Sequence, residues 1–191
     1  MPRCGSSGEP SLTHWKRKSK GRSGAVSSLG EIVRIDAVKF VRFLPASPES
    51  VWAFLTETSR ITAWYGDDGR IEPREGGTVW LMGGHIRGVV TQWKPGRKLA
   101  YTWNVFSPGE TESSFPESYL TFEIKPDGPV TQLTLTHMPI PPEFSAQTKM
   151  GWHTYLDLVT AIAQGDTPQP RATYMKQNAE LYGINLNDLP Q

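Results

Sequence analysis

The sequence of 191 residues has a single cysteine, no excess of either charge and no long apolar run. The one cysteine, Cys4, excludes an internal disulfide framework and a metal site built from several cysteines. No segment approaches the ~18 uninterrupted apolar residues that span a bilayer. With 20 basic and 19 acidic side chains, the net charge of +1 gives no general attraction to nucleic acid or to an anionic membrane.

Motifs for several common chemistries are missing as well. The glycine patterns that bind nucleotide phosphates do not occur, and neither does the G-x-S-x-G turn that presents a nucleophilic serine. The spacing of His85, His137 and His153 does not predict a metal site. We therefore expect no cofactor, and no motif identifies a catalytic residue.

Composition divides the chain into three parts. Residues 1–31 combine five Gly and seven Ser with six basic and two acidic side chains, and such a segment cannot bury enough apolar surface to fold. We expect a disordered basic tail there, without the apolar core of an export signal, and hence a cytoplasmic protein. Residues 32–165 contain the strong periodicity and predict one domain. Residues 166–191 predict a proline-stiffened linker and a short helix over 171–182.

Within residues 32–165 the pattern predicts a strand, two short helices, a meander of strands and a long helix. Ser47-Pro48 is typical of a helix start, and Gly165 is typical of a helix end. Turn residues separate the successive strands. The expected strands cover 33–44, 70–73, 78–82, 85–93, 98–104, 119–125 and 130–138, and the expected helices cover 48–56, 59–64 and 142–164.

The apolar surfaces of these elements predict how the elements pack together. One face of the meander is apolar, and so is one stripe of the long helix, where Trp152, Leu156 and Val159 recur at helical spacing. Both surfaces are buried if the helix lies across a curved antiparallel sheet. This predicts an α+β helix-grip fold, in which two short helices after the first strand close one end. Gly151, inside the helix, predicts a close approach to the sheet or to the occupant of a cavity.

Several segments, taken in their order and spacing, resemble one known family over about residues 38–165. They are RFLPASPESVWAFLT (42–56), AWY (63–65), EGG (75–77), GVVTQW (88–93), KPGRKL (94–99), YTW (101–103), TQLTLTH (131–137) and the GW pair at 151–152. These residues resemble the C-terminal-domain type of the activator of heat-shock-protein-ninety ATPase, within the START-like (SRPBCC, birch-pollen-allergen-like) superfamily. The resemblance implies a START-like helix-grip fold, and through the superfamily it implies a cavity for hydrophobic molecules.

Aromatic residues are the best indication of a binding site. Seven Trp are many for this length and suit the wall of an apolar cavity, although they would also suit a solid core. His137 is in phase with two inward leucines, so it is expected to contact a ligand, to act as a general base or to be a satisfied structural histidine. The connection over 105–117 is long enough to form a lid. The expected ligand contacts are Trp64, Trp80, Trp103, Tyr119, His137, Trp152 and Tyr155.

Three functions fit these observations. The leading prediction is a domain that binds a small hydrophobic or amphipathic molecule in a cavity between the sheet and the long helix. The second, drawn from the resemblance, is a co-chaperone-like regulator of a heat-shock ATPase, acting through its surface. The third is an enzyme of the cyclase or hydrolase type that uses the cavity. We expect no nucleic-acid partner and no membrane span, and a chain that is a monomer or a homodimer.

Overall fold

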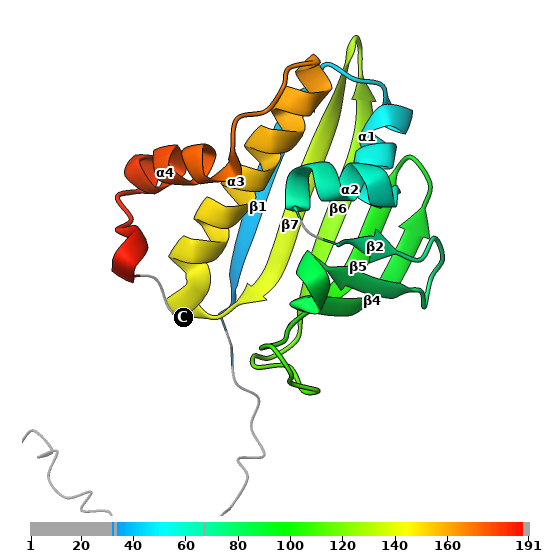
Figure 1. The fold of residues 1–191 in the computed structure, drawn as a ribbon. Coiled ribbons are helices and arrows are strands. Elements are labelled where there is room, and N and C mark those ends of the chain that lie inside the picture. The colour runs from blue at the N-terminus through cyan, green and yellow to red at the C-terminus, as the bar shows by residue number, and fades with distance from the viewer. Residues whose placement is uncertain (1–31, 33, 67, 189–191) are drawn as a thin grey trace, which may run out of the picture. The chain divides into compact units, whose positions relative to one another are not determined.

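Seven antiparallel strands form one sheet, and a long helix lies across one face of it (Figure 1). The computed structural model describes residues 32, 34–66 and 68–188, so the predicted tail over 1–31 lies outside the described residues. The described residues from Arg34 onward form one unit. In sheet order the strands are β1 (Asp36–Leu44), β7 (Val130–Ile140), β6 (Ser118–Asp127), β5 (Lys98–Val105), β4 (Ile86–Lys94), β3 (Thr78–Leu81) and β2 (Arg70–Ile71).

The helices begin and end at residues that suit those positions. The Ser47 hydroxyl accepts a hydrogen bond from the Ser50 backbone N–H (3.2 Å) and caps the first helix, as predicted. Gly165 adopts a left-handed φ of 82° and ends the long helix, because glycine takes this conformation without steric cost. The helices are α1 (Pro48–Thr56), α2 (Thr58–Tyr65), α3 (Ser145–Gln164) and α4 (Arg171–Tyr182).

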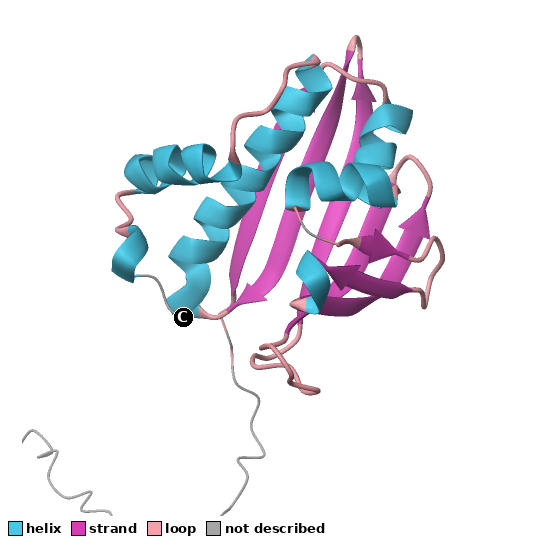
Figure 2. Cartoon of the chain, viewed as in Figure 1, coloured by secondary structure: helices cyan, strands magenta, loops and turns pink. Residues whose placement is uncertain are grey.

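The core lies between the concave face of the sheet and α3 (Figure 2). Alternate residues of β5, β6 and β7 point inward, so that Leu99, Phe122 and Leu135 are almost completely buried. Trp152 and Leu156 on the facing stripe of α3 are buried against them. The predicted α+β helix-grip fold and the predicted inward face of the meander are therefore confirmed. Among the described residues, no helix has the length and apolar character needed to cross a membrane.

Helix α4 packs along the flank of α3 on which His153 and Asp157 lie, and these two residues also contact Phe40 and Arg42 of β1. The sequence of α3 alone predicts that His153 and Asp157 face solvent, and this expectation is wrong. The Asn178 amide of α4 donates to the Asp157 carboxylate (2.9 Å), and His153 Nδ1 lies 2.8 Å from the Tyr182 hydroxyl. Helix α3 is therefore packed on two sides, and its polar side chains find partners in a helix that follows it in the chain.

Several element boundaries differ from the prediction by one to three residues, most of all at the starts of β1 and α3. Strand β1 begins at Asp36 rather than at residue 33, and its pairing with β7 is irregular between Asp36 and Val38. The predicted helix over 142–164 begins as a 3-10 turn over Pro142–Phe144 before the α-helix starts at Ser145. A proline at the first position provides no backbone N–H, which suits the entry to a helix but does not specify which helical form follows.

Candidate functional site

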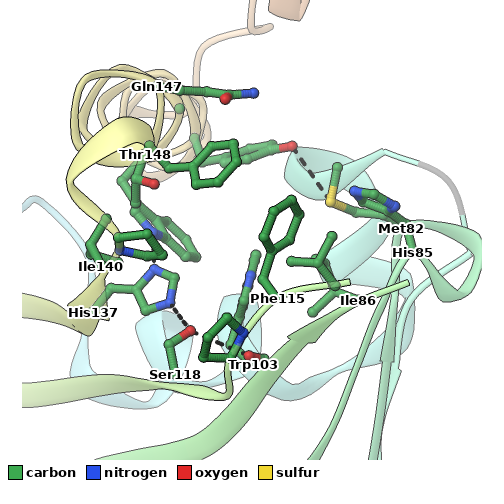
Figure 3. Close-up of a pocket in the computed structure, with 17 residues that line it drawn as sticks. Met82, His85, Ile86, Trp103, Phe115, Ser118, His137, Ile140, Gln147 and Thr148 are labelled. Carbon is green, nitrogen blue, oxygen red and sulfur yellow. Dashed lines mark hydrogen bonds between the residues drawn. The ribbon is translucent and has the colours of Figure 1, made fainter. Parts of the chain in front are cut away.

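A cavity of about 310 Å³ lies between α3, the ends of β5 to β7 and the turn that follows β3 (Figure 3). Its lining is mostly apolar. Trp103 and His137 line it from the sheet, and Trp152 lines it from α3. Phe115 and Phe144 meet at one side, with their ring centroids 4.7 Å apart in an edge-to-face arrangement. The aromatic residues therefore surround a hollow at this end of the fold rather than a solid core.

A chain of hydrogen bonds ties the sheet to α3 beside this cavity. The indole N–H of Trp152 donates to His137 Nδ1 (3.0 Å), and His137 Nε2 lies 2.8 Å from the Ser118 hydroxyl. Because an indole nitrogen can only donate, Nδ1 must carry a lone pair, and the proton of the neutral ring is on Nε2. His137 Nε2–H then donates to Ser118 Oγ, which in turn donates to the Trp103 carbonyl (3.2 Å).

This arrangement favours the structural interpretation of His137. Burial lowers the pKa of His137 from 6.5 to about 4, so the ring is neutral at pH 7. Both ring nitrogens have partners within the protein, and a general base would have to break the bond from Trp152 to free a lone pair. His137 therefore fixes the orientation of Trp152 in the cavity wall, while the edge of its own ring lines the cavity.

The turn after β3 forms another part of the cavity wall. Met82 has φ = +55°, a left-handed conformation that is uncommon for residues other than glycine. Its side chain reaches toward α3, where the Tyr155 hydroxyl lies 3.9 Å from the Met82 sulfur. Tyr155 also accepts a hydrogen bond from Arg171 at the start of α4 (3.2 Å). The contact between Met82 and Tyr155 thus links the turn after β3 to α3, and Arg171 of α4 helps to hold Tyr155 in place.

Gly151 and Gln147 on α3 shape the remaining wall. A Cβ atom built on Gly151 would meet no atom within 4 Å, so the predicted close approach to the sheet is wrong. Because Gly151 lines the cavity, its missing side chain leaves space there. The side-chain oxygen of Gln147 is buried, lines the same cavity and has no hydrogen-bond partner among the described residues. An acceptor that is buried without a partner costs free energy unless a bound molecule or a water supplies a donor.

Four of the seven residues predicted to contact a ligand come together in the lining, namely Trp103, His137, Trp152 and Tyr155. Trp64 lies behind this wall, where its indole N–H donates to the Phe54 carbonyl (2.7 Å) and its ring packs against Tyr155.

The predicted positions of Trp80 and Tyr119 in the cavity are wrong, because both lie on the outer face of the sheet. Trp80 lies between the inward residues Val79 and Leu81, and Tyr119 lies between Ser118 and Leu120. Successive side chains of a strand point to opposite faces, so these neighbours place both aromatic rings outside.

Sequence reasoning missed several lining residues. Met82, Phe144 and Gln147 are in turns or on the first turns of α3, where no periodic signal distinguishes a cavity residue from a surface residue. In the connection over 105–117, Phe115 lines the cavity, whereas Phe106 does not and packs against Arg87. Among the described residues, no group of His, Cys, Asp or Glu is arranged to hold a metal ion.

Comparison with known proteins agrees with this architecture. The curated protein "Activator of 90 kDa heat shock protein ATPase homolog" of Dictyostelium discoideum is 30% identical over 107 residues, which are 56% of this chain. The chain spans only 27% of the length of that relative.

Two solved structures share the fold. CalU16 of Micromonospora echinospora has a TM-score of 0.62 at 21% identity and covers 77% of this chain and 85% of its own. An HSP90 activator of Plasmodium falciparum has a TM-score of 0.57 at 21% identity and covers 70% of this chain and 99% of its own. At this level of identity the likeness concerns the START-like fold alone. Residues 45–164 match the family described as "Activator of Hsp90 ATPase homolog 1-like protein", and the chain belongs to that family.

Proposed function

We propose that the chain binds a small, largely apolar molecule that carries a hydrogen-bond donor, in the cavity between the sheet and α3. The observation that supports this best is an apolar cavity whose wall includes a buried acceptor, the Gln147 side-chain oxygen, without a protein partner among the described residues. Its volume of about 310 Å³ lies at the lower end of the range of ~300–1,000 Å³ that is usual for ligand pockets.

The wall suits binding by burial with little reorganisation. Transfer of apolar surface from water contributes roughly 25 cal/mol per Å². Trp152 is held by His137, and Tyr155 is held by Arg171 and contacts Met82, so these rings are ordered before a ligand arrives. A preordered wall lowers the entropic cost of binding. A donor on the ligand would form a hydrogen bond with the Gln147 side-chain oxygen. Without such a partner, the buried oxygen costs ~1–3 kcal/mol of stability.

Gly151 provides the sharpest test. Gly151→Leu places a side chain in the cavity without a clash at Cβ, whereas Gly151→Ala adds one methyl group and serves as the matched control. The probe is 1-anilinonaphthalene-8-sulfonate, which has an apolar body and an N–H donor, and its fluorescence is titrated against each variant. We expect wild type and Gly151→Ala to bind the dye, and Gly151→Leu to bind at least about ten-fold more weakly, a loss of ~1.4 kcal/mol.

Thermal unfolding of the same variants separates a filled cavity from a damaged fold. We expect Gly151→Leu to unfold at or above the wild-type temperature, because both leucine and alanine are better helix formers than glycine. Equal dye affinity of Gly151→Leu and wild type would place the dye elsewhere and contradict the proposal. Native mass spectrometry of freshly purified protein adds a search for a resident molecule of a few hundred daltons, released on denaturation.

A second candidate function is regulation of an Hsp90-type ATPase. The family match and the Dictyostelium discoideum relative favour it, although the chain spans about a quarter of that relative. Such a role requires the chain to share a compartment with the ATPase, and the expected compartment is the cytoplasm. The test adds the chain to a purified Hsp90 and measures ATP hydrolysis. Stimulation that survives Gly151→Leu would indicate an activity of the surface, and the absence of any stimulation would contradict this candidate.

A further inference from the structure

Trp80 is the centre of a row of side chains on the outer face of the sheet. Arg70 of β2, Trp80 of β3 and Arg87 of β4 occupy directly opposite positions in the strand register. The guanidinium carbons of Arg70 and Arg87 lie 5.2 Å and 4.8 Å from the Trp80 ring centroid. Both distances are within the range of cation–π attraction, ~6 Å. We call these three residues the arginine–tryptophan row.

Several contacts hold the row in one conformation. Arg87 also lies over the ring of Phe106 (4.3 Å), and its Nε–H donates to the Gly84 carbonyl (2.9 Å). The Trp80 indole packs directly against Gly84, where a Cβ atom would overlap the ring. An arginine whose plane is held between two rings has lost most of its rotamer freedom before any partner binds, so a partner need not bear that entropic cost.

The two arginines differ in their charge partners. Arg70 is 3.4 Å from the Asp68 carboxylate. Arg87 has no carboxylate within 4.0 Å among the described residues, and its two terminal nitrogens have no acceptor there. A planar guanidinium with free terminal nitrogens can bind a carboxylate through two parallel hydrogen bonds. Arg87 is thus a fixed cation that lacks an acidic partner within the described part of the chain.

The next register row extends the same face with exposed apolar side chains. Thr78 of β3 is opposite Val89 of β4, and Tyr119 of β6 is opposite Met138 of β7. Val89, Tyr119 and Met138 are 47%, 46% and 37% exposed. Helices α1, α2 and α3 all pack on the other face of the sheet (Figure 1). Arginine, tryptophan, tyrosine and methionine are the residues enriched at protein interfaces, and the first three dominate their hot spots.

We propose that this outer face docks an acidic segment of another protein, in which a carboxylate binds Arg87 while Trp80 and Val89 provide the apolar contact. Charge complementarity selects this occupant, because Arg87 has no carboxylate within 4.0 Å among the described residues, and the nearby Glu117 carboxylate is bonded to Asn104 and Tyr119 instead. The period of two along a β-strand suits an extended acidic segment that alternates acidic and apolar side chains. The proposal is independent of the cavity, which lies on the other side of the sheet.

The test uses a capped hexapeptide that alternates Glu and Leu, and the same peptide with Gln in place of Glu. Binding to the full chain is followed by the NMR signal of the Trp80 indole N–H, assigned with Trp80→Phe. We expect the acidic peptide to shift this signal and the Gln peptide to leave it unchanged. Arg87→Ala should weaken binding at least about ten-fold, and Arg87→Lys should weaken it less, since lysine keeps the charge but loses the planar fork.

Arg97→Ala is the matched control, because Arg97 is an exposed arginine in the turn between β4 and β5, outside the proposed docking face. This variant should bind the acidic peptide like wild type. Equal affinities of Arg87→Ala and Arg97→Ala, or no response of Trp80 to the acidic peptide, would overturn the proposal. Sedimentation velocity of the chain alone tests the other occupant. Self-association that Arg87→Ala abolishes would identify a second copy as the partner and would likewise overturn it.

Discussion

At the scale of single residues, His137 connects two elements through nitrogen atoms with opposite roles. Nδ1 accepts from Trp152 on α3, and Nε2 donates to Ser118 on β6. Protonation would place a second N–H opposite the indole N–H of Trp152, where two donors would face each other. The bond between the sheet and α3 therefore depends on a neutral imidazole.

This geometry predicts a pH-dependent stability. The pKa of His137 is about 4 in the folded chain and about 6.5 in the unfolded chain, so the unfolded chain takes up the proton first as the pH falls. The free energy of unfolding should therefore fall from about pH 6.5 to about pH 4, by up to ~3 kcal/mol. Urea unfolding across this range measures the effect. In His137→Asn this part of the pH dependence should disappear, and an unchanged slope would contradict the assignment.

Two neighbouring glycines predict a contrast in stability. Gly83 has φ = +63° and open space around it, while Gly84 has φ = +89° and packs against the Trp80 ring. Gly83→Ala should cost ~1–2 kcal/mol, the usual cost of a left-handed conformation for alanine. Gly84→Ala should cost more, because its methyl group also displaces the indole. Thermal unfolding compares the two variants, and equal losses would contradict the packing of Trp80 on Gly84.

Single residues also show where sequence-based prediction reached its limit. His137 was correctly expected to point inward, because its phase follows from Leu133 and Leu135 on the same strand. The same rule applied to Leu120 would have placed Tyr119 outside. Gln147 could not have been identified, because the lack of a partner for a buried oxygen depends on every side chain around it. The face to which a strand residue points follows from its neighbours in the sequence. Whether a buried polar atom has a hydrogen-bond partner depends on residues that are distant in the sequence.

At the scale of elements, α4 is attached to α3 by a buried polar contact. Asn178 and Thr154 are 4% and 2% exposed, and the Asn178 amide donates to the Thr154 hydroxyl (3.3 Å) as well as to Asp157 (2.9 Å). Buried polar groups of this kind stabilise a contact only while all of them are paired. The attachment of α4 thus depends in part on the Asn178 side chain, alongside the contacts of Tyr182 with His153 and of Arg171 with Tyr155.

Replacement of Asn178 should therefore loosen α4. Asn178→Ala leaves Thr154 and Asp157 without this donor, and the cost of unsatisfied buried groups is ~1–3 kcal/mol. Gln177→Ala, on the exposed side of the same helix, serves as the control and should have little effect. Hydrogen exchange of the α4 amides reports the result. We expect faster exchange in Asn178→Ala alone, and equal exchange in the two variants would show that other contacts hold the helix.

Helix ends were predicted better than helix partners. Ser47 and Gly165 identify the start of α1 and the end of α3 by chemistry that is local to the chain. The docking of α4 on α3 was only partly predictable, because its Asn178 meets residues more than 20 positions earlier. A capping residue bonds to the backbone of its own turn. A residue such as Asn178 contacts a different helix, and the sequence does not show which helices lie side by side.

At the scale of the whole molecule, the sheet joins the first strand to the last. Strand β1 pairs with β7, and Leu44 lies opposite Thr131. Strands β6 and β7 are instead joined by a tight turn at Gly128. Loop-closure entropy opposes distant pairings more than local ones, so we expect the β6–β7 hairpin to form before β1 docks.

This order predicts how two core variants change the kinetics. Leu44→Ala and Leu135→Ala each remove a fully buried side chain and should each cost ~2–5 kcal/mol. We expect β7 to be structured in the transition state, so Leu135→Ala should mainly slow refolding, whereas Leu44→Ala should mainly accelerate unfolding. Stopped-flow tryptophan fluorescence in urea measures both rates. The opposite distribution of effects would show that β1 docks first.

The arrangement of the sheet and α3 was predictable from two apolar surfaces, but the choice between a cavity and a solid core was not. A sheet face and a helix stripe can be buried together in few ways, so the helix-grip arrangement followed from periodicity. Whether Trp103 and Trp152 fill the interior or surround a hollow depends on side-chain volumes on facing elements, including the missing side chain at Gly151. The outer row of Arg70, Trp80 and Arg87 likewise depends on strand register, which the sequence does not specify.

The pairing of β1 with β7 also has a consequence for synthesis on the ribosome. Strand β1 emerges first, and its partner follows about 90 residues later. At roughly 5–20 residues per second, the first strand waits roughly 4–18 s for the strand that completes its hydrogen bonds. During this interval the apolar side chains of Val38 and Phe40 have no sheet to cover them. The nascent chain therefore exposes an apolar, aggregation-prone segment during translation until β7 has been synthesised.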